Sequence, residues 1–320
     1  MLRKLLLVFA VSTCLAAGSA AAQSGRTTRL IVAFPPGGPV DFVARVLAEQ
    51  LTKEIGHTVI VENKAGANGN IGAEFVAKAA PDGSVLLLTS VGAVAISPAL
   101  YEKLPYDPQR DFAPVSVVVN NATVFVVNPN NPAANAAEFV AATKQRKEST
   151  PVGSSGVGSI PHLTLELFAD SSKARVLHVP YKGAAPVITD VIGGQVSGFF
   201  GDLPGLIGHI RGGRLKPLGI AAAKRLPLLP QVSTLAEQGI AGVESNNWYG
   251  LVAPAKTPPD QIDAFNRAVR RALAAETVRA KLIAAGADPA PSSPEELAAL
   301  IKSDAAKWAG IIKEKGIKAE

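Results

Sequence analysis

Short apolar runs alternate with stretches of helical spacing along most of the chain. In the first third, apolar runs occur at 30–34, 58–61 and 85–89. Between them, apolar residues recur three and four positions apart, as one buried face of a helix requires. The order strand, helix, strand, helix, strand predicts a parallel sheet with crossover helices.

The same pattern returns in the middle of the chain and then gives way to helices. Two apolar strands are predicted at 115–119 and 123–127. The predicted elements after them are helices at 133–147, 161–169 and 186–192, strands at 175–179, 195–200, 215–221 and 248–252, and helices at 261–275, 277–285 and 294–315. The second half therefore predicts another α/β unit followed by a helical end.

Both halves share one design, in which a buried strand leads through a glycine-rich loop into a helix. We therefore expect an α/β fold of two lobes, each a mixed sheet flanked by helices, with a ligand cleft between them. Crossover strands near 118–126 and 245–252 would join the lobes. The first lobe would be discontinuous, comprising 23–122 plus 248–320, and the second lobe would comprise 123–247.

The first 22 residues have the three-part pattern of a secretory signal peptide. Arg3 and Lys4 form a basic start, 5–17 is apolar, and Ala22 ends a small-residue cleavage site. An uncleaved anchor is the alternative, but a spanning helix needs roughly 20 apolar residues. Cleavage after Ala22 would remove Cys14, the single cysteine. A protein exported to the periplasm, without disulfides or thiolates, is expected.

Charge and composition argue against several classes of partner. The formal net charge is +6, loss of Arg3 and Lys4 would leave +4, and the basic residues are scattered. With only 5% aromatic residues, no nucleic-acid-binding surface is expected. The four histidines, His57, His162, His178 and His209, lack the spacing of metal ligands. Neither a metal site nor a cofactor is predicted.

The loop at 34–41 is the first candidate site. It follows a predicted strand and opens a helix, so its unpaired amides and the helix dipole suit an anion. The candidate contacts are Phe34, Pro36, Gly37 and Gly38. Asp41 lies at the start of the helix, where capping is favoured over ligand contact.

A second glycine-rich loop at 65–72 offers the same chemistry. Its glycines are three apart and do not form a dinucleotide fingerprint. Ala67 and Asn68 are candidate contacts, as is Ser90 at the end of the strand predicted at 85–89. A structural turn with a close helix–sheet contact is the alternative for this loop.

The third candidate loop, 153–159, is rich in hydroxyl groups. It provides Ser154, Ser155, Gly156 and Ser159 and is followed by His162. It is not a phosphate loop, because no Gly-Lys-Ser/Thr follows, and it is not a nucleophile elbow. An exported hydrolase using Ser155 or Ser159 with His162 is the alternative to a binding role, although no complete triad is present.

Five short motifs in order give the chain a resemblance to a known family. The motifs are Phe34-Pro35-Pro36-Gly37-Gly38 with Asp41 and Arg45, Val61-Glu62-Asn63-Lys64, Leu104-Pro105-Tyr106-Asp107 with Asp111-Phe112-Ala113-Pro114-Val115, Val179-Pro180-Tyr181-Lys182-Gly183, and Leu229-Pro230 with Thr234, Leu235 and Glu237. The chain resembles the Bug family, the extracytoplasmic solute receptors of tripartite tricarboxylate transporters.

The resemblance implies a fold, a ligand class and further site residues. The implied fold is that of two-lobed, type II-like periplasmic binding proteins. The implied ligand is a small carboxylate, such as an organic acid, an acidic amino acid or an aromatic acid. The first-lobe loops would hold the carboxylate through backbone amides and water. The remaining groups of the ligand would be contacted by Tyr181, Gly183, Ala184 and Asp202. Lys182 would pair with a second carboxylate or lie in solvent.

Two positions depart from the family pattern. The family often has Phe-Asp before the Leu-Pro of the second lobe, whereas Gly201 stands in place of that Asp here and Asp202 follows. The loop Ala67-Asn68-Gly69 also has a bulkier residue where relatives commonly have glycine, which would narrow the pocket. Both departures argue against transferring any named ligand to this chain.

These observations predict a solute-binding protein that is not an enzyme. Its expected partners are the carboxylate ligand and either membrane transporter subunits or a membrane sensor kinase, and a monomer is expected. The effector lobe of a transcription regulator is a third reading, which the signal peptide and the lack of an N-terminal helix-turn-helix disfavour.

Overall fold

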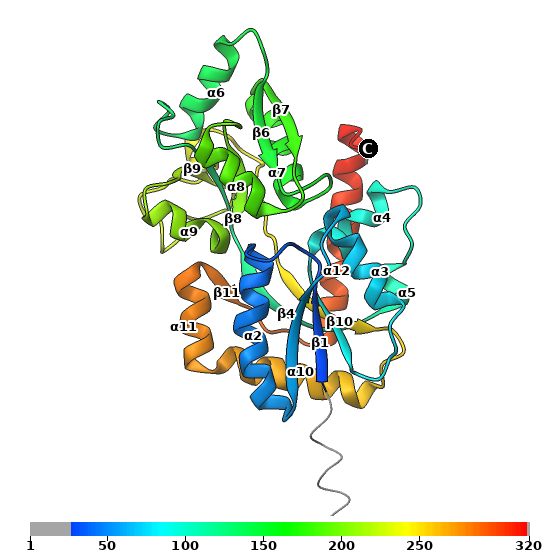
Figure 1. Cartoon of the computed structure of the whole chain (residues 1–320). Helices are drawn as coiled ribbons and strands as arrows, with labels where there is room; N and C mark the ends of the chain where they lie inside the picture. The colour runs from blue at the N-terminus through cyan, green and yellow to red at the C-terminus, as the bar shows by residue number, and fades with distance from the viewer. Residues whose placement is uncertain (1–26, 319–320) are drawn as a thin grey trace, which may run out of the picture.

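The computed structural model describes residues 27–318, which form two α/β lobes placed one above the other (Figure 1). The first lobe, below in this view, contains the beginning and the end of the described chain, and the second lobe, in green, contains the middle. This confirms the predicted two-lobed α/β fold. The predicted signal peptide, 1–22, lies outside the described residues.

A mixed sheet of six strands forms the centre of the first lobe. Its strands are β1 (Thr27–Val32), β2 (Thr58–Asn63), β3 (Val85–Ser90), β4 (Phe112–Asn121), β10 (Tyr249–Pro254) and β11 (Ala287–Pro289), in the order β11-β4-β10-β3-β1-β2 across the sheet. β1 pairs in parallel with β2 and β3, as the predicted alternation requires, whereas β10 runs antiparallel to β3 and β4. All residues of β3 are buried, as expected for a strand covered on both faces.

Helices cover both faces of this sheet. One hydrophobic core joins Leu30 and Val32 of β1 to α2 (Pro39–Ile55), α10 (Pro259–Ala274) and α11 (Glu276–Ala285). The alternate residue Ile31 faces a second core with α3 (Asn70–Ala77) and α12 (Pro294–Lys315). The remaining short elements of this lobe are η1 (Ala67–Gly69), the π-helical turn η2 (Gly92–Ile96), α4 (Ser97–Leu100) and α5 (Pro108–Asp111).

The second lobe repeats this architecture on a five-stranded mixed sheet. Its strands are β5 (Thr123–Val127), β6 (Thr150–Ser154), β7 (Val176–Pro180), β8 (Phe199–Asp202) and β9 (Lys216–Ile220), in the order β7-β6-β8-β5-β9. Its helices are α6 (Ala136–Gln145), α7 (Ile160–Ser172), α8 (Ala184–Gly193), α9 (Leu203–Arg211) and the short η3 (Ala236–Gln238). Phe125 and Phe200 pack with α6 and α7 on one face, and Val124 and Phe199 pack with α8 and α9 on the other.

Two chain segments cross between the lobes side by side. β4 ends at Asn121 and β5 begins at Thr123, while the returning chain passes through Asn247 before β10. The Asn247 amide donates to the Asn121 carbonyl at 3.1 Å, and the Asn121 side chain donates to the Asn247 carbonyl at 2.7 Å. Such a paired crossing is where a hinge would lie. The boundaries at 122/123 and 247/248 stay a prediction.

Several elements differ from the sequence pattern for identifiable reasons. The strand predicted at 195–200 begins only at Phe199, because the amides of Gln195 and Val196 donate to the Asp190 carbonyl at the end of α8. The helix predicted at 133–147 is shorter, since Asn135 caps it by accepting from the Glu138 amide at 2.9 Å. The pattern did not predict α9, whose two glycines lower its helix propensity.

Candidate functional site

The loop between β1 and α2 ends in a helix start without a side-chain cap. Gly38 is the N-cap of α2, and no side chain caps this helix start. The Asp41 carboxylate accepts from the Gly37 amide at 3.0 Å, from Arg45 at 2.8 and 2.9 Å and from Asn63 at 2.9 Å. Burial opposes ionisation of Asp41, but these hydrogen bonds outweigh it and lower the pKa. Asp41 therefore stabilises the loop by binding the Gly37 amide just before the helix, and whether it also contacts ligand stays untested.

The loop before α3 is strained and also ends in an uncapped helix start. Gly66, Ala67, Asn68 and Gly69 all have positive φ, and Ala67 and Asn68 have φ of 46° and 55°. Non-glycine residues keep a left-handed backbone only where the surrounding structure holds them in it, and such residues are found most often at active sites and ligand-binding loops. Gly69 is the N-cap of α3 and has no side-chain cap.

The third loop is stabilised mainly by its own side chains. The Ser159 hydroxyl caps α7 by accepting from the His162 amide at 3.3 Å, and it donates to the Gly156 carbonyl at 2.7 Å. The Ser154 hydroxyl accepts from the Gly156 amide at 3.1 Å and lies 2.6 Å from Nε2 of His178. Ser154 and Ser159 thus fix the loop that presents Ser155.

The ring of His162 is occupied by contacts that leave no catalytic pair. Its Nδ1 accepts from the Gly158 amide at 3.0 Å, and its Nε2 lies 3.5 Å from the Glu166 carboxylate. The ring stacks on His178 with centroids 3.8 Å apart. Burial, with His162 nearby, lowers the pKa of His178 to about 4. His162 bonds Ser159 only through its backbone amide, and among the described residues no hydrogen bond joins its ring to Ser155 or Ser159, so the predicted serine–histidine pair is not formed.

The turn before α8 faces the first lobe. Gly183 is the N-cap of α8, with φ of 109° and no side-chain cap. A Cβ on Gly183 would lie 2.7 Å from Cδ of Pro35. The Tyr181 hydroxyl donates to the Asp190 carboxylate at 2.7 Å, and burial together with this bond raises the Tyr181 pKa to about 12. Tyr181 therefore uses its donor within the second lobe, and exposed Lys182 lies beside it.

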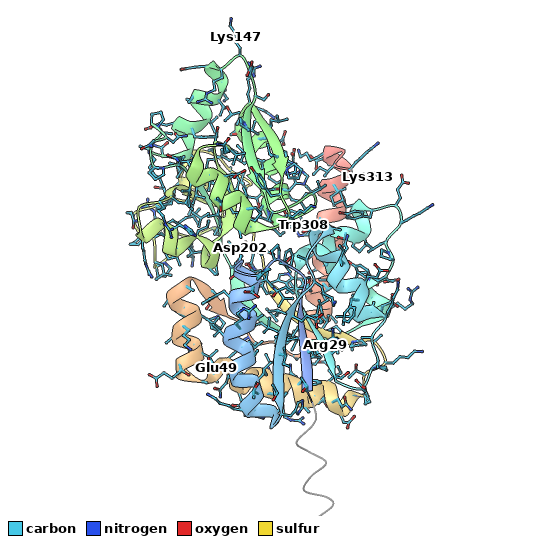
Figure 2. All side chains as sticks on the ribbon, viewed as in Figure 1. Arg29, Glu49, Lys147, Asp202, Trp308 and Lys313 are labelled. Atoms are coloured by element: carbon cyan, nitrogen blue, oxygen red, sulfur yellow. The ribbon has the colours of Figure 1, made fainter. Side chains whose placement is uncertain are left out.

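Asp202 lies at the junction of the lobes (Figure 2). Its Oδ2 accepts from the Asn247 amide group at 2.8 Å and from the Tyr249 hydroxyl at 2.5 Å. Burial raises the pKa of Asp202 to about 7, although both hydrogen bonds lower it. Tyr249 packs in the first-lobe core, and Trp248 donates to Asp304 of α12 at 2.7 Å.

The candidate loops meet at two adjoining cavities between the lobes. An inner cavity of about 30 Å³ is lined by Phe34, Gly38, Asn68, Ser90, Ser155, Ser159, Ala184 and Asp202, among others. An outer cavity of about 270 Å³ is lined by Phe34, Ala67, Asn68, Ser155, Gly156, Tyr181, Lys182 and Gly183, among others. Asn68 and Ser155 line both, so the two spaces form one cleft with a narrow inner end.

The structure brings most of the predicted site residues together. Four of them, Pro36, Gly37, Ser154 and His162, are not part of the lining of either cavity. Pro36 and Gly37 are exposed, whereas Ser154 and His162 are buried in the contacts described above. Whether any predicted residue contacts ligand stays a prediction.

Asn247 was not identified from the sequence, although it lines the inner cavity. Its segment is predicted as a crossover, and the polar pair Asn246-Asn247 before a buried strand is the only sequence signal. Tyr101 and Phe199 were also missed, because apolar residues at strand and helix ends are indistinguishable from core residues in a sequence.

The space that Gly201 leaves is occupied by Phe199. A Cβ on Gly201 would lie 2.3 Å from Cε1 of Phe199, two positions earlier on the same face of β8. Phe199 itself lines the inner cavity. The departure at Gly201 is thus coupled to the position of an aromatic ring in the cleft.

Two lobes around a cleft lined by uncapped helix starts define a solute-binding protein. Within residues 27–318, no helix is long and apolar enough to cross a membrane, and no cluster of His, Cys, Asp or Glu could hold a metal ion. The profile of the tripartite tricarboxylate transporter family receptors matches residues 43–317. The chain belongs to this family of solute-binding receptors.

Similar proteins agree with this assignment. Protein BugT of Bordetella pertussis is 36% identical over 301 residues, covering 94% of this chain and 92% of BugT. The structure of MatC from Rhodopseudomonas palustris with bound malate is 32% identical, with a TM-score of 0.85, and covers 90% of this chain and 99% of MatC. An R. palustris protein solved with adipate is 32% identical, with a TM-score of 0.89, covering 92% of this chain and 98% of that chain. The resemblance to the Bug family is confirmed.

Proposed function

We propose that this chain is a periplasmic receptor, and not an enzyme, that captures a small carboxylate-bearing metabolite. It would deliver the ligand to a tripartite tricarboxylate-type transporter or to a membrane sensor. The observation that carries the proposal is that α2, α3 and α8 all begin at glycines without side-chain caps, and that all three glycines line the cleft.

Helix starts of this kind can bind a carboxylate without a buried arginine. Each provides unpaired amides and the positive end of a helix dipole. A hydrogen bond to a charged group contributes roughly 1.5–3 kcal/mol. Four such bonds near the upper end of this range contribute about 12 kcal/mol. With a cost of about 4 kcal/mol for immobilising the ligand, about 8 kcal/mol is left, which corresponds to micromolar affinity.

The comparisons support a carboxylate as the ligand class. MatC was solved with malate and another relative with adipate, so receptors of this fold accept short and longer dicarboxylates. Because α2 and α3 belong to one lobe and α8 to the other, a ligand bound by both would favour the closed form. Binding as a monomer is expected.

Thermal unfolding against a ligand panel tests the proposal. The mature protein is unfolded and refolded to remove carried-over ligand and is then heated with mono-, di- and tricarboxylates, amino acids and aromatic acids. A ligand at about 100 times its Kd adds roughly 2.7 kcal/mol of stability. A raised Tm with one class identifies the ligand, whereas no shift with any carboxylate contradicts the proposal.

Cell fractionation tests the expected location. The protein should be recovered in the periplasmic fraction, with an N-terminus at Gln23 if the chain is cut after Ala22. Recovery of the full-length chain in the cytoplasm would contradict an exported receptor.

A further inference from the structure

The inner end of the cleft contains buried polar atoms without partners. These atoms are Oδ1 and Nδ2 of Asn68, Oδ1 of Asp202 and Oδ1 of Asn247. All three residues line the inner cavity, and each is less than a tenth exposed. Buried polar groups are nearly always hydrogen-bonded, so such a cluster calls for a partner from outside the chain.

The unpartnered atoms are mostly acceptors. Asn247 donates through Nδ2 to Asp202, which identifies its free atom as the carbonyl oxygen. Tyr249 and Asn247 both donate to Oδ2 of Asp202, which leaves Oδ1 free. When Asp202 is ionised, three acceptors thus lie beside one donor group, Nδ2 of Asn68. A carboxylate has only acceptor oxygens, so it would leave the carbonyl oxygens of Asn68 and Asn247 without a donor in either protonation state of Asp202.

Asn68 is held in place at this position by its neighbours. Its φ of 55° is left-handed, and a Cβ on Gly92 would lie 2.5 Å from Nδ2 and 2.7 Å from Oδ1 of Asn68. A Cβ on Gly158 of the second lobe would lie 3.4 Å from the same Nδ2. Gly92 therefore makes room for the Asn68 amide, which lies next to Gly158 of the second lobe.

We propose that the ligand carries an ammonium group beside its carboxylate, and that Asp202, Asn247 and Asn68 accept hydrogen bonds from this ammonium group. The ligand is then an amino acid, with its carboxylate at the helix starts. This inference rests on the proposed function and narrows its ligand class. An ammonium brings three donors and a positive charge, whereas a hydroxyl brings one donor and no charge.

The charges around Asp202 support a cation at this position. Among the described residues, no Lys or Arg forms an ion pair with Asp202. The titratable group that faces it is Tyr249, whose pKa burial raises well above its ordinary value, so it stays neutral. A buried carboxylate without a counter-ion favours a cationic ligand group.

A matched ligand series tests the proposal. Each set has one carbon skeleton with hydrogen, hydroxyl or ammonium next to the carboxylate: propionate, lactate and alanine; succinate, malate and aspartate; glutarate, 2-hydroxyglutarate and glutamate; adipate, 2-hydroxyadipate and 2-aminoadipate; 3-phenylpropionate, phenyllactate and phenylalanine. In the set that binds, the amino acid should bind at least tenfold more tightly than the other two, measured by calorimetry.

The possible results separate the two proposals. If a hydroxy acid or an unsubstituted acid binds as tightly as its amino counterpart, the ammonium proposal is wrong while the carboxylate receptor stands. If no member of any set binds, the proposed function itself fails.

Two variants and a control assign the preference to the cleft. Asp202→Asn should reduce amino-acid affinity at least tenfold and remove the preference over the hydroxy acid. Asn68→Gly suits the left-handed backbone and should fold, and it should reduce the same preference. Asp263→Asn, an exposed position on α10, should change neither. An unchanged preference in both cleft variants would overturn the assignment.

Proton release on binding gives an independent readout. An ammonium beside Asp202 stabilises its ionised form, so binding near pH 7 should release a proton, and amino-acid affinity should weaken below that pH. Calorimetry in buffers of different ionisation enthalpy measures this release. Proton uptake would instead place a ligand carboxylate beside Asp202 and contradict the proposal.

Discussion

At Gly183 the two lobes lie so close together that one added methyl group would push them apart. A Cβ there would lie 2.7 Å from Cδ and 2.8 Å from Cγ of Pro35. The proline ring is rigid, and the loop that carries it is fixed by Asp41 and Asn63. Neither side can move away cheaply, so Gly183→Ala should oppose closure of the cleft.

The expected effect has two parts that act on different states. With φ of 109° and ψ of 176°, Gly183 lies in a region almost confined to glycine, so an alanine there is strained by about 1–3 kcal/mol in the open and closed forms alike. The overlap with Pro35 exists only in the closed form and costs roughly 1–3 kcal/mol. Since only the second part opposes closure, ligand affinity should fall about 5- to 150-fold.

Gly194→Ala provides the matched control at the other end of α8. Gly194 has φ of 78°, and a Cβ there would meet nothing within 4 Å. Both variants should lose stability in urea unfolding because both place alanine at positive φ, and Gly183→Ala should lose more. Its φ of 109° with ψ of 176° is almost confined to glycine, whereas Gly194, with φ of 78° and ψ of 10°, is left-handed. Only Gly183→Ala should weaken ligand binding in calorimetry. Equal affinities for the two variants would refute the idea that Gly183 touches Pro35 in the bound form.

Three further predictions follow from charged groups. In the ligand-free protein, Asp202 has a pKa raised to about 7 and so keeps a proton that the same residue loses near pH 4 in the unfolded chain. Between these values the free energy of unfolding should therefore fall as pH rises, by up to about 1.4 kcal/mol per pH unit. Asp202→Asn should remove this slope in urea unfolding from pH 4.5 to 8. Asp41→Ala should cost about 1–3 kcal/mol at pH 7, with less effect as pH falls through the lowered Asp41 pKa, and a loss below 0.5 kcal/mol in thermal unfolding would contradict its role. Lys315 of α12 forms an ion pair at 2.6 Å with half-exposed Asp170 of the second lobe, and such exposed pairs contribute little free energy. Lys315→Ala should therefore change ligand affinity less than about fivefold, and a larger loss would show that α12 holds the lobes closed.

The sequence predicted the lobes and loops because each depends on local signals. Apolar runs specify buried strands, and glycine-rich stretches specify the turns that follow them. The short elements η2 and β11 could not be predicted in this way, because they are held by tertiary contacts. In η2, for example, the Ala93 carbonyl accepts from the Tyr106 hydroxyl at 2.6 Å, across 13 positions of sequence.

The motifs that mark the family mostly stabilise the scaffold. Asp41, Arg45 and Asn63 come from two motifs and form one hydrogen-bonded cluster under the first loop. Thr234 and Glu237 cap each other's backbone amides at 3.1 and 2.7 Å. A motif can therefore identify the family and position the loops without revealing which ligand they bind.

Ligand specificity is less visible in sequence because it depends on pairs of residues that are distant along the chain. Asn68 is accommodated because position 92 is glycine, and the ring of Phe199 lies where a side chain at position 201 would be. Each of these two residues has a glycine beside it, so the packing stays feasible while the shape and the hydrogen-bonding groups of the cleft change. Neither Asn68 nor Gly201 can be interpreted alone. A relative with glycine at position 68 and aspartate at position 201 would need a differently placed aromatic ring at position 199. Its inner cleft would then present different hydrogen-bond acceptors to the ligand.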